Sequence, residues 1–266
     1  MKRRHERILP LLERAGPVLS WFQVCELMEE ALLGEHLLEA DAAAWRRALI
    51  YKGHLKSYGR SARGLYRNTR IAREPVAAEY LCAALPTAYL VYFSALHHHG
   101  MTLRVPNDLQ YSVRKWRSAP EALGFRPSLP PLPEQLITLP LRKRALRGPI
   151  EVRELPQPRI GVASRAWTLV HAVRKPAFCG GWSHVGTVLQ RHLAAHASEV
   201  VRILEENGSA IDKVRFGYIL DEVLGLQLPI LSEWEKLAQR GGSRVLVVGR
   251  PYADTYSERW CLSLNT

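Results

Sequence analysis

The sequence has few of the residues and patterns on which many functional sites depend. It contains only four cysteines, and these lie far apart, so that no CxxC pair or zinc-ligand spacing occurs: Cys25, Cys82, Cys179 and Cys261. No apolar run approaches the roughly 20 residues of a transmembrane helix, and charged residues interrupt any secretory signal near the start. We therefore expect a cytoplasmic protein with reduced thiols, no metal or cofactor, and no membrane partner.

Residue patterns typical of an active site are also sparse. The three consecutive histidines at 97–99 point about 100° apart on a helix and cannot all bind one ion. A magnesium-dependent nuclease would need clustered carboxylates, and the densest ones, Asp221-Glu222 and the pair Glu233 and Glu235, fall on predicted helices without an acidic partner on a strand. We expect no enzyme, and the nuclease is the less favoured alternative.

Basic residues, in contrast, are abundant and concentrated. The 266 residues carry 37 Lys and Arg against 25 Asp and Glu, a formal net charge of +12. Residues 40–73 hold nine of the basic side chains and a single acidic one, Asp41, whereas residues 161–266 are nearly balanced. Positive charge that is segregated in this way indicates a polyanionic partner.

The first quarter of the chain predicts three helices followed by a hairpin. Apolar spacing predicts a first helix that ends at Gly16-Pro17. Ser20 and Gln23 have the spacing of a capping box for the second helix, and Asp41 is expected to cap a third helix that runs to Gly53. Basic strands over 54–58 and 63–67 are expected to pair. These elements predict a winged helix-turn-helix over residues 1–74.

The third helix and the hairpin carry the candidate DNA contacts. A helix fits the major groove of duplex DNA, where the small side chain of Ala43 permits close approach and Arg46 or Arg47 can read a guanine. Phosphate or wing contacts are expected from Lys52, Lys56, Arg60 and Arg63. The alternative is that the arginines form a solvated helix face and that the hairpin is a structural ribbon.

Residues 75–266 predict a mixed α/β domain, so the fold class is α+β with an amino-terminal winged helix-turn-helix. Ser164 and Ser183 are expected to cap two of its helices, and Leu109–Val113 is one of its expected strands. A second basic cluster, Arg142 to Arg147, either extends the DNA-binding surface or is a solvated loop.

Short motifs follow one another along the chain in a recognisable order. The run Tyr92-Phe-Ser-Ala-Leu-His-His-His-Gly-Met-Thr102 resembles the Ser-Ala-Leu-x-x-x-Gly-Leu segment of the AbiE-type antitoxins, which belong to type IV toxin–antitoxin systems. Three later segments are also similar to that family: Val162-Ala-Ser-Arg-Ala-Trp-Thr-Leu-Val-His171, Gly217-Tyr-Ile-Leu220 and Trp260-Cys-Leu-Ser-Leu-Asn265. The family usually has Asp where this chain has His171.

The resemblance implies a division of labour between two domains. The amino-terminal winged helix would repress the chain's own operon by binding double-stranded operator DNA. The carboxyl-terminal domain would counteract a nucleotidyltransferase-like toxin, which is the partner protein that the resemblance implies. The alternative is a stand-alone transcriptional regulator whose carboxyl-terminal domain dimerises or senses an effector.

Overall fold

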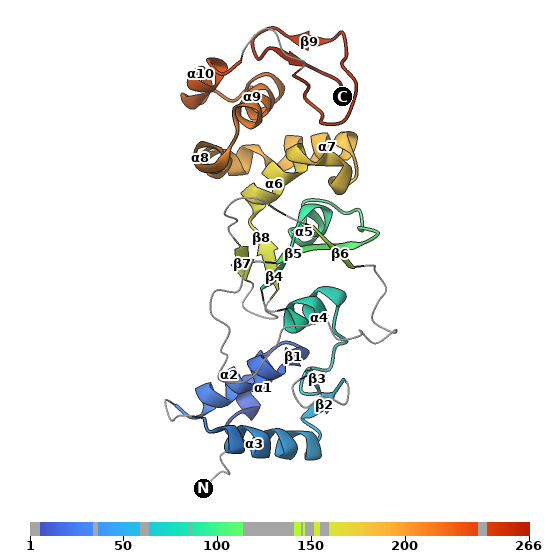
Figure 1. Ribbon diagram of the computed structural model, residues 1–266, viewed down its shortest axis with the longest axis vertical. Coiled ribbons are helices and arrows are strands. Elements are labelled where there is room, and N and C mark those ends of the chain that lie inside the picture. The colour runs from blue at the N-terminus through green and yellow to red at the C-terminus, as the bar shows by residue number, and fades with distance from the viewer. Residues whose placement is uncertain are drawn as a thin grey trace. The chain divides into compact units, whose positions relative to one another are not determined.

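The computed structural model describes residues 6–33, 37–58, 64–85, 87–113, 141–144, 146, 152–154, 160–238 and 244–266. The chain contains helices and several sheets, consistent with the expected α+β class (Figure 1). It divides into two compact units. The first comprises Met1–Leu90, Asn107–Lys143 and Arg153–Gly161, and the second comprises Val91–Pro106, Arg144–Val152 and Val162–Thr266. The limits at residues 1–74 and 75–266 stay a prediction.

Three helices build the apolar core of the first unit: α1 (Leu9–Arg14), α2 (Trp21–Ala31) and α3 (Glu39–Tyr51). The predicted capping box of α2 is confirmed, since the Gln23 amide donates to the Ser20 hydroxyl at 3.3 Å and the Ser20 amide donates to the Gln23 side chain at 2.9 Å. The predicted cap of α3 is wrong. Leu38 is the N-cap, and Asp41 lies within the first turn, where its carboxylate interacts favourably with the positive end of the helix dipole.

A three-stranded antiparallel sheet accompanies these helices, in the order β1 (Val18–Ser20), β3 (Leu65–Asn68) and β2 (Leu55–Ser57). The predicted hairpin is confirmed, with Lys56 opposite Arg67 in the β2–β3 pair. Sequence patterning did not predict β1, which consists of three buried residues immediately before α2. Helix α4 (Ala77–Ala84) packs against the sheet, where Tyr80 joins a buried cluster with Val18 and Leu65.

A second sheet has the strand order β6 (Leu141–Lys143), β5 (Leu109–Val113), β4 (Ala88–Leu90), β8 (Gly161–Ala163) and β7 (Val152–Glu154). β4 and β5 are antiparallel, and β5 and β6 are parallel. The predicted strand Leu109–Val113 is confirmed with the same limits.

The second unit is mainly helical. Its α-helices are α5 (Tyr92–His98), α6 (Arg165–Arg174), α7 (Trp182–His192), α8 (Ala197–Asn207), α9 (Ala210–Tyr218) and α10 (Ile230–Glu235). Two 3-10 helices, Pro176–Cys179 and Ala194–His196, and a π-helix, Ile219–Val223, connect them. A short antiparallel pair, β9 (Tyr256–Ser257) and β10 (Leu262–Ser263), follows.

Local capping and one close approach explain how the second unit packs. Ser164 caps α6 as predicted, because its hydroxyl accepts from the Trp167 amide at 3.3 Å. Ser183 does not cap α7, which begins one position earlier, after Gly181. A Cβ atom at Gly217 would lie 2.1 Å from the Trp260 ring, so only glycine lets α9 and this tryptophan pack together. Among the described helices, none is long and apolar enough to span a membrane.

Candidate nucleic-acid interface

The outer face of α3 is defined by which of its side chains are exposed. Ala40, Ala44, Arg47 and Tyr51 are exposed, and their spacing places them along one stripe of the helix. Trp45 and Leu49, on the opposite side, are 7% and 0% exposed and belong to the apolar core. The apolar spacing of α3 predicts this buried side, whereas the exposed stripe includes Ala44 and Tyr51, which are not among the candidate residues.

Arg46 and Arg47 occupy different environments although they are adjacent. Arg46 is half-buried, and its guanidinium carbon lies 5.5 Å from the centre of the Trp21 ring. It also hydrogen-bonds the Tyr66 hydroxyl; burial raises the pKa of that phenol, and Arg46 opposes the rise. Arg47 is exposed, and no described residue makes a hydrogen bond, ion pair or ring contact with its side chain. Ala43, the proposed point of close approach, is half-buried.

The two lysines that follow α3 also differ in whether an acidic side chain compensates their charge. The Lys52 ammonium lies 3.2 Å from the Glu6 carboxylate, so its charge is compensated. Lys56 is exposed in the middle of β2, and within the described ranges its side chain has no polar partner. Arg60 and Arg63, the other expected wing contacts, lie outside the described residues.

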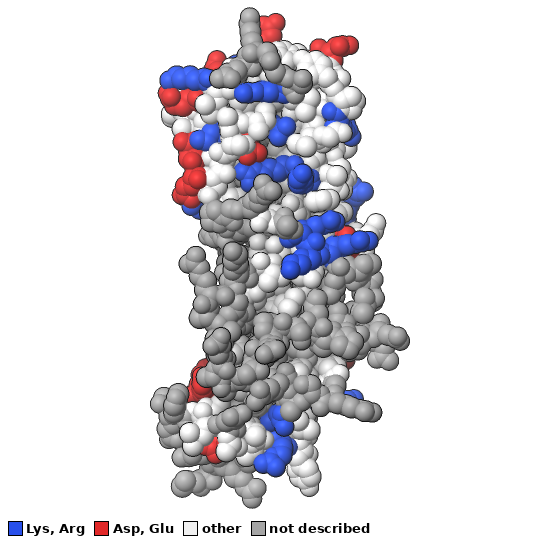
Figure 2. Space-filling model, in the orientation of Figure 1, with Lys and Arg blue, Asp and Glu red and all other residues white. Residues whose placement is uncertain are grey.

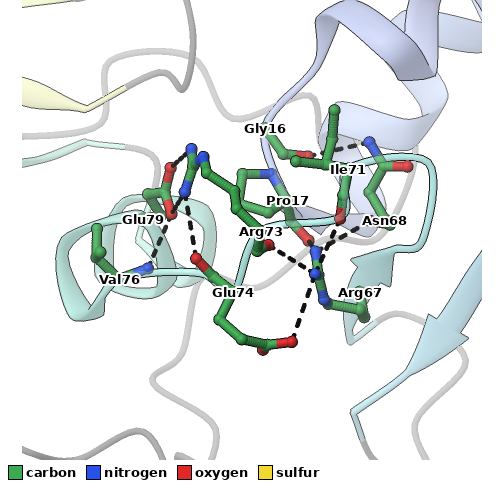
Figure 3. Close-up of polar contacts among 9 residues, drawn as sticks. All are labelled: Gly16, Pro17, Arg67, Asn68, Ile71, Arg73, Glu74, Val76 and Glu79. Atoms are coloured by element: carbon green, nitrogen blue, oxygen red, sulfur yellow. Dashed lines mark hydrogen bonds and ion pairs between the residues drawn. The ribbon is translucent and has the colours of Figure 1, made fainter.

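Three further arginines of the basic stretch, Arg67, Arg70 and Arg73, make contacts that stabilise the fold, and Figure 3 shows those of Arg67 and Arg73. The side chain of Arg67 is 12% exposed and donates hydrogen bonds to the backbone carbonyls of Pro17, Asn68, Ile71 and Arg73 at 2.7–3.1 Å. Arg70 pairs with Glu13 of α1. These contacts hold β3 against α1 and against the turn that leads to α4.

Arg73 completes this set through a buried carboxylate. Its guanidinium donates to both oxygens of Glu79, whose side chain is 2% exposed (Figure 3). The same carboxylate accepts from the Val76 amide at 2.9 Å and so caps the start of α4. Among the described basic residues of 40–73, Arg47 on α3 and Lys56 on β2 are therefore the exposed ones whose charge has no partner within the first unit.

The second basic cluster is partly described. In the first unit, the Arg142 guanidinium lies 3.7 Å from the Asp108 carboxylate. In the second unit, the Arg144 guanidinium lies 4.0 Å above the centre of the Phe178 ring. Arg147 lies outside the described residues. Both described arginines therefore have partners within their own unit, and whether this cluster contacts DNA stays untested.

Two histidines of the second unit, His99 and His171, make contacts inside the fold. The Nε2 atom of His99 lies 2.7 Å from the Ala163 carbonyl oxygen. His171 is 2% exposed between the rings of Tyr92 and Trp167, and burial, followed by the nearby Arg174, lowers its pKa to about 3. Its Nδ1 atom has no hydrogen-bond partner among the described residues. Within the same residues, no group of three or more His, Cys, Asp or Glu side chains could hold a metal ion.

A model of the AbiEi antitoxin C-terminal domain matches residues 88–222, just over half of the chain. The chain belongs to the AbiEi antitoxin family. Its role is accordingly that of an antitoxin in a toxin–antitoxin system. The matched span of this AbiEi antitoxin runs from β4 into the π-helix and includes the Tyr92–Thr102 motif. The α3 and β2 surface lies outside it, so the match does not bear on DNA binding.

A solved structure shows a more distant similarity to this chain. The crystal structure of the RV2827C protein from Mycobacterium tuberculosis is 15% identical to it, with 97% of this chain and 90% of that chain covered and a TM-score of 0.49. No curated protein matches the chain.

Proposed function

We propose that this AbiEi antitoxin acts in the cytoplasm as a DNA-binding repressor of its own toxin–antitoxin operon. In this proposal residues 1–74 form a winged helix-turn-helix, with α3 as the recognition helix and the β2–β3 hairpin as the wing. Residues 75–266 form the domain that counteracts a nucleotidyltransferase-like toxin.

The observation that carries the DNA-binding part is an exposed, uncompensated positive charge on two neighbouring elements. The order α1, β1, α2, α3, β2, β3 is the order of a winged helix-turn-helix. Arg47 on α3 and Lys56 on β2 are both exposed and without a partner among the described residues. An arginine on a helix can enter the major groove, and a lysine on the adjacent strand can contact phosphate.

DNA binding is tested with the full chain and a duplex that covers the region upstream of its gene. A shuffled duplex of the same length and composition is the control. We expect tighter binding to the upstream duplex and a linear loss of log affinity with log salt concentration for both duplexes. Equal affinity for the two duplexes at every salt concentration would contradict sequence-specific repression.

Family membership supports the toxin-directed part of the proposal. The test expresses the neighbouring nucleotidyltransferase-like reading frame in a bacterial host, alone and together with the full antitoxin. Growth is expected to stop with the toxin alone and to resume when both are present. A host that remains arrested while the antitoxin is abundant would contradict this part and leave DNA binding unaffected.

A further inference from the structure

The adjacent residues Arg46 and Arg47 cannot perform the same task. Successive helix positions differ by about 100°, so one of the two arginines at most can lie in the middle of the stripe that faces a groove. Arg47 lies on the exposed stripe between Ala44 and Tyr51, whereas Arg46 is turned toward the helix side that carries the buried residues.

The contacts of Arg46 occupy its guanidinium inside the first unit. It lies over the Trp21 ring at the start of α2 and hydrogen-bonds Tyr66 on β3. Trp21 and Tyr66 are 6% and 1% exposed, and their ring centres are 6.3 Å apart. One side chain of α3 therefore contacts both α2 and β3, which fixes the rotation of α3 about its own axis.

The exposed stripe carries side chains that can recognise the edges of DNA bases. Arginine can donate two parallel hydrogen bonds to the O6 and N7 atoms of guanine, and an alanine methyl group can contact a thymine methyl group. Ala44, one turn before Arg47, leaves the helix surface low enough for the bases to approach. Tyr51, at the end of α3, is 92% exposed and has a hydroxyl that suits a phosphate oxygen.

We propose that Arg47 is the base-reading arginine of α3, with a guanine as its target, and that Arg46 is a positioning residue that holds the Arg47 stripe toward the groove. This inference rests on the proposed DNA-binding function. It assigns the two arginines separate roles, which the sequence alone left open.

The test selects binding sites for the full chain from a pool of random-sequence duplex DNA. The wild type is compared with Arg47→Ala, Arg47→Lys, Arg46→Ala and Arg46→Lys, and the melting temperature of each variant is measured. Arg14→Ala is the matched control, because Arg14 is exposed at the end of α1 in the same unit and its loss removes the same charge.

We expect Arg47→Ala to keep the wild-type melting temperature and to lose preference at one G·C pair per bound copy, about 10- to 100-fold. Arg47→Lys should recover charge but only part of that preference, because lysine lacks the two-pronged donor. Arg46→Ala should lower the melting temperature and select the same sequence as the wild type more weakly, and Arg46→Lys should restore part of both. Arg14→Ala should leave the selected sequence unchanged.

Two results would overturn the assignment. One is an unchanged selected sequence with Arg47→Ala, and the other is loss of one base-pair preference with Arg46→Ala at an unchanged melting temperature. If the wild type selects no sequence at all, the proposed repressor function fails and the inference fails with it.

Discussion

Helices α8–α10 of the second unit and the α3–β2 surface of the first unit differ in whether their basic side chains have acidic partners. Over α8–α10, acidic and basic side chains lie beside one another (Figure 2). The ion pairs among the described residues of this region include Arg174–Asp212, Lys213–Glu205, Arg202–Glu206, Lys236–Glu233, Arg259–Asp221 and Arg259–Glu235. Arg47 and Lys56, by comparison, have no partner among the described residues.

This difference shows that the number of basic residues is a poor guide to a binding surface. Inside residues 40–73, Arg67, Arg70 and Arg73 contact carbonyls or carboxylates of the first unit, just as the basic side chains of α8 and α9 contact nearby carboxylates. A paired cation stabilises the fold, whereas an exposed and unpaired one is available to a phosphate or a base. Substitutions in the two groups should therefore affect different measurements.

The largest effect is expected from Asp212→Ala. The Asp212 carboxylate accepts from Arg174 at 2.9 Å and from the amide and hydroxyl of Ser209 at 3.0 and 2.7 Å, and the residue is 7% exposed. Its loss leaves Arg174 without a carboxylate partner and removes the acceptor of the Ser209 amide from the capping box of α9, so the free energy of unfolding should fall by about 3 kcal/mol. Chemical denaturation measures this fall. Glu206→Ala, which breaks the exposed pair with Arg202, is the control and should change stability by less than about 1 kcal/mol.

Glu79→Ala tests whether the ion pair between Glu79 and Arg73 stabilises the first unit, as the pair between Asp212 and Arg174 is expected to stabilise the second. The substitution removes the partner of Arg73 and the acceptor of the Val76 amide, and we expect a loss of about 2 kcal/mol in the free energy of unfolding. The ratio of affinities for upstream and shuffled DNA should remain at the wild-type value. A changed ratio at unchanged stability would place Arg73 and Glu79 in the DNA interface instead.

His171→Phe tests the buried interior of the second unit through pH. The folded-state pKa of His171, about 3, lies below its ordinary value, so the unfolded chain binds the proton first as pH falls. The stability that neutral His171 provides is complete above about pH 6.5 and declines by roughly 1 kcal/mol per pH unit toward pH 3. The phenylalanine variant, measured by denaturation at pH 7, 6 and 5, should lack this part of the decline. Parallel curves for the two proteins would show that His171 is not buried as described.

Local signals explain which parts of this structure could be predicted from sequence. The capping box at Ser20, the cap at Ser164 and the strand Leu109–Val113 depend on residues close together in the chain, and all three were predicted correctly. β1 could not be predicted, because its three residues form a strand only when they pair with β3, far along the sequence.

The same limit applies to the candidate interface. The helical period of α3 predicts that Trp45 and Leu49 are buried, and it contains the signal that would have selected Ala44 and Tyr51 for the outer stripe. The acidic partners of the basic residues could not be predicted from such a period, because Glu6 precedes Lys52 by 46 positions and Glu13 precedes Arg70 by 57. No local pattern relates such residues, so only the fold separates the paired cations from the unpaired ones.

The smallest effect, and the one most specific to the α3–β2 surface, is expected from Lys56→Ala. Lys56 is exposed and has no partner among the described residues, so its loss should leave the melting temperature unchanged. If it contacts one phosphate, affinity for upstream and shuffled DNA should fall by the same factor, and the slope of log affinity against log salt should become shallower by about 0.9. Lys52→Ala is the matched control, because Glu6 already compensates that charge and its removal should change the slope less. A slope equal to that of the wild type would remove β2 from the interface and leave α3 as the element that carries the proposal.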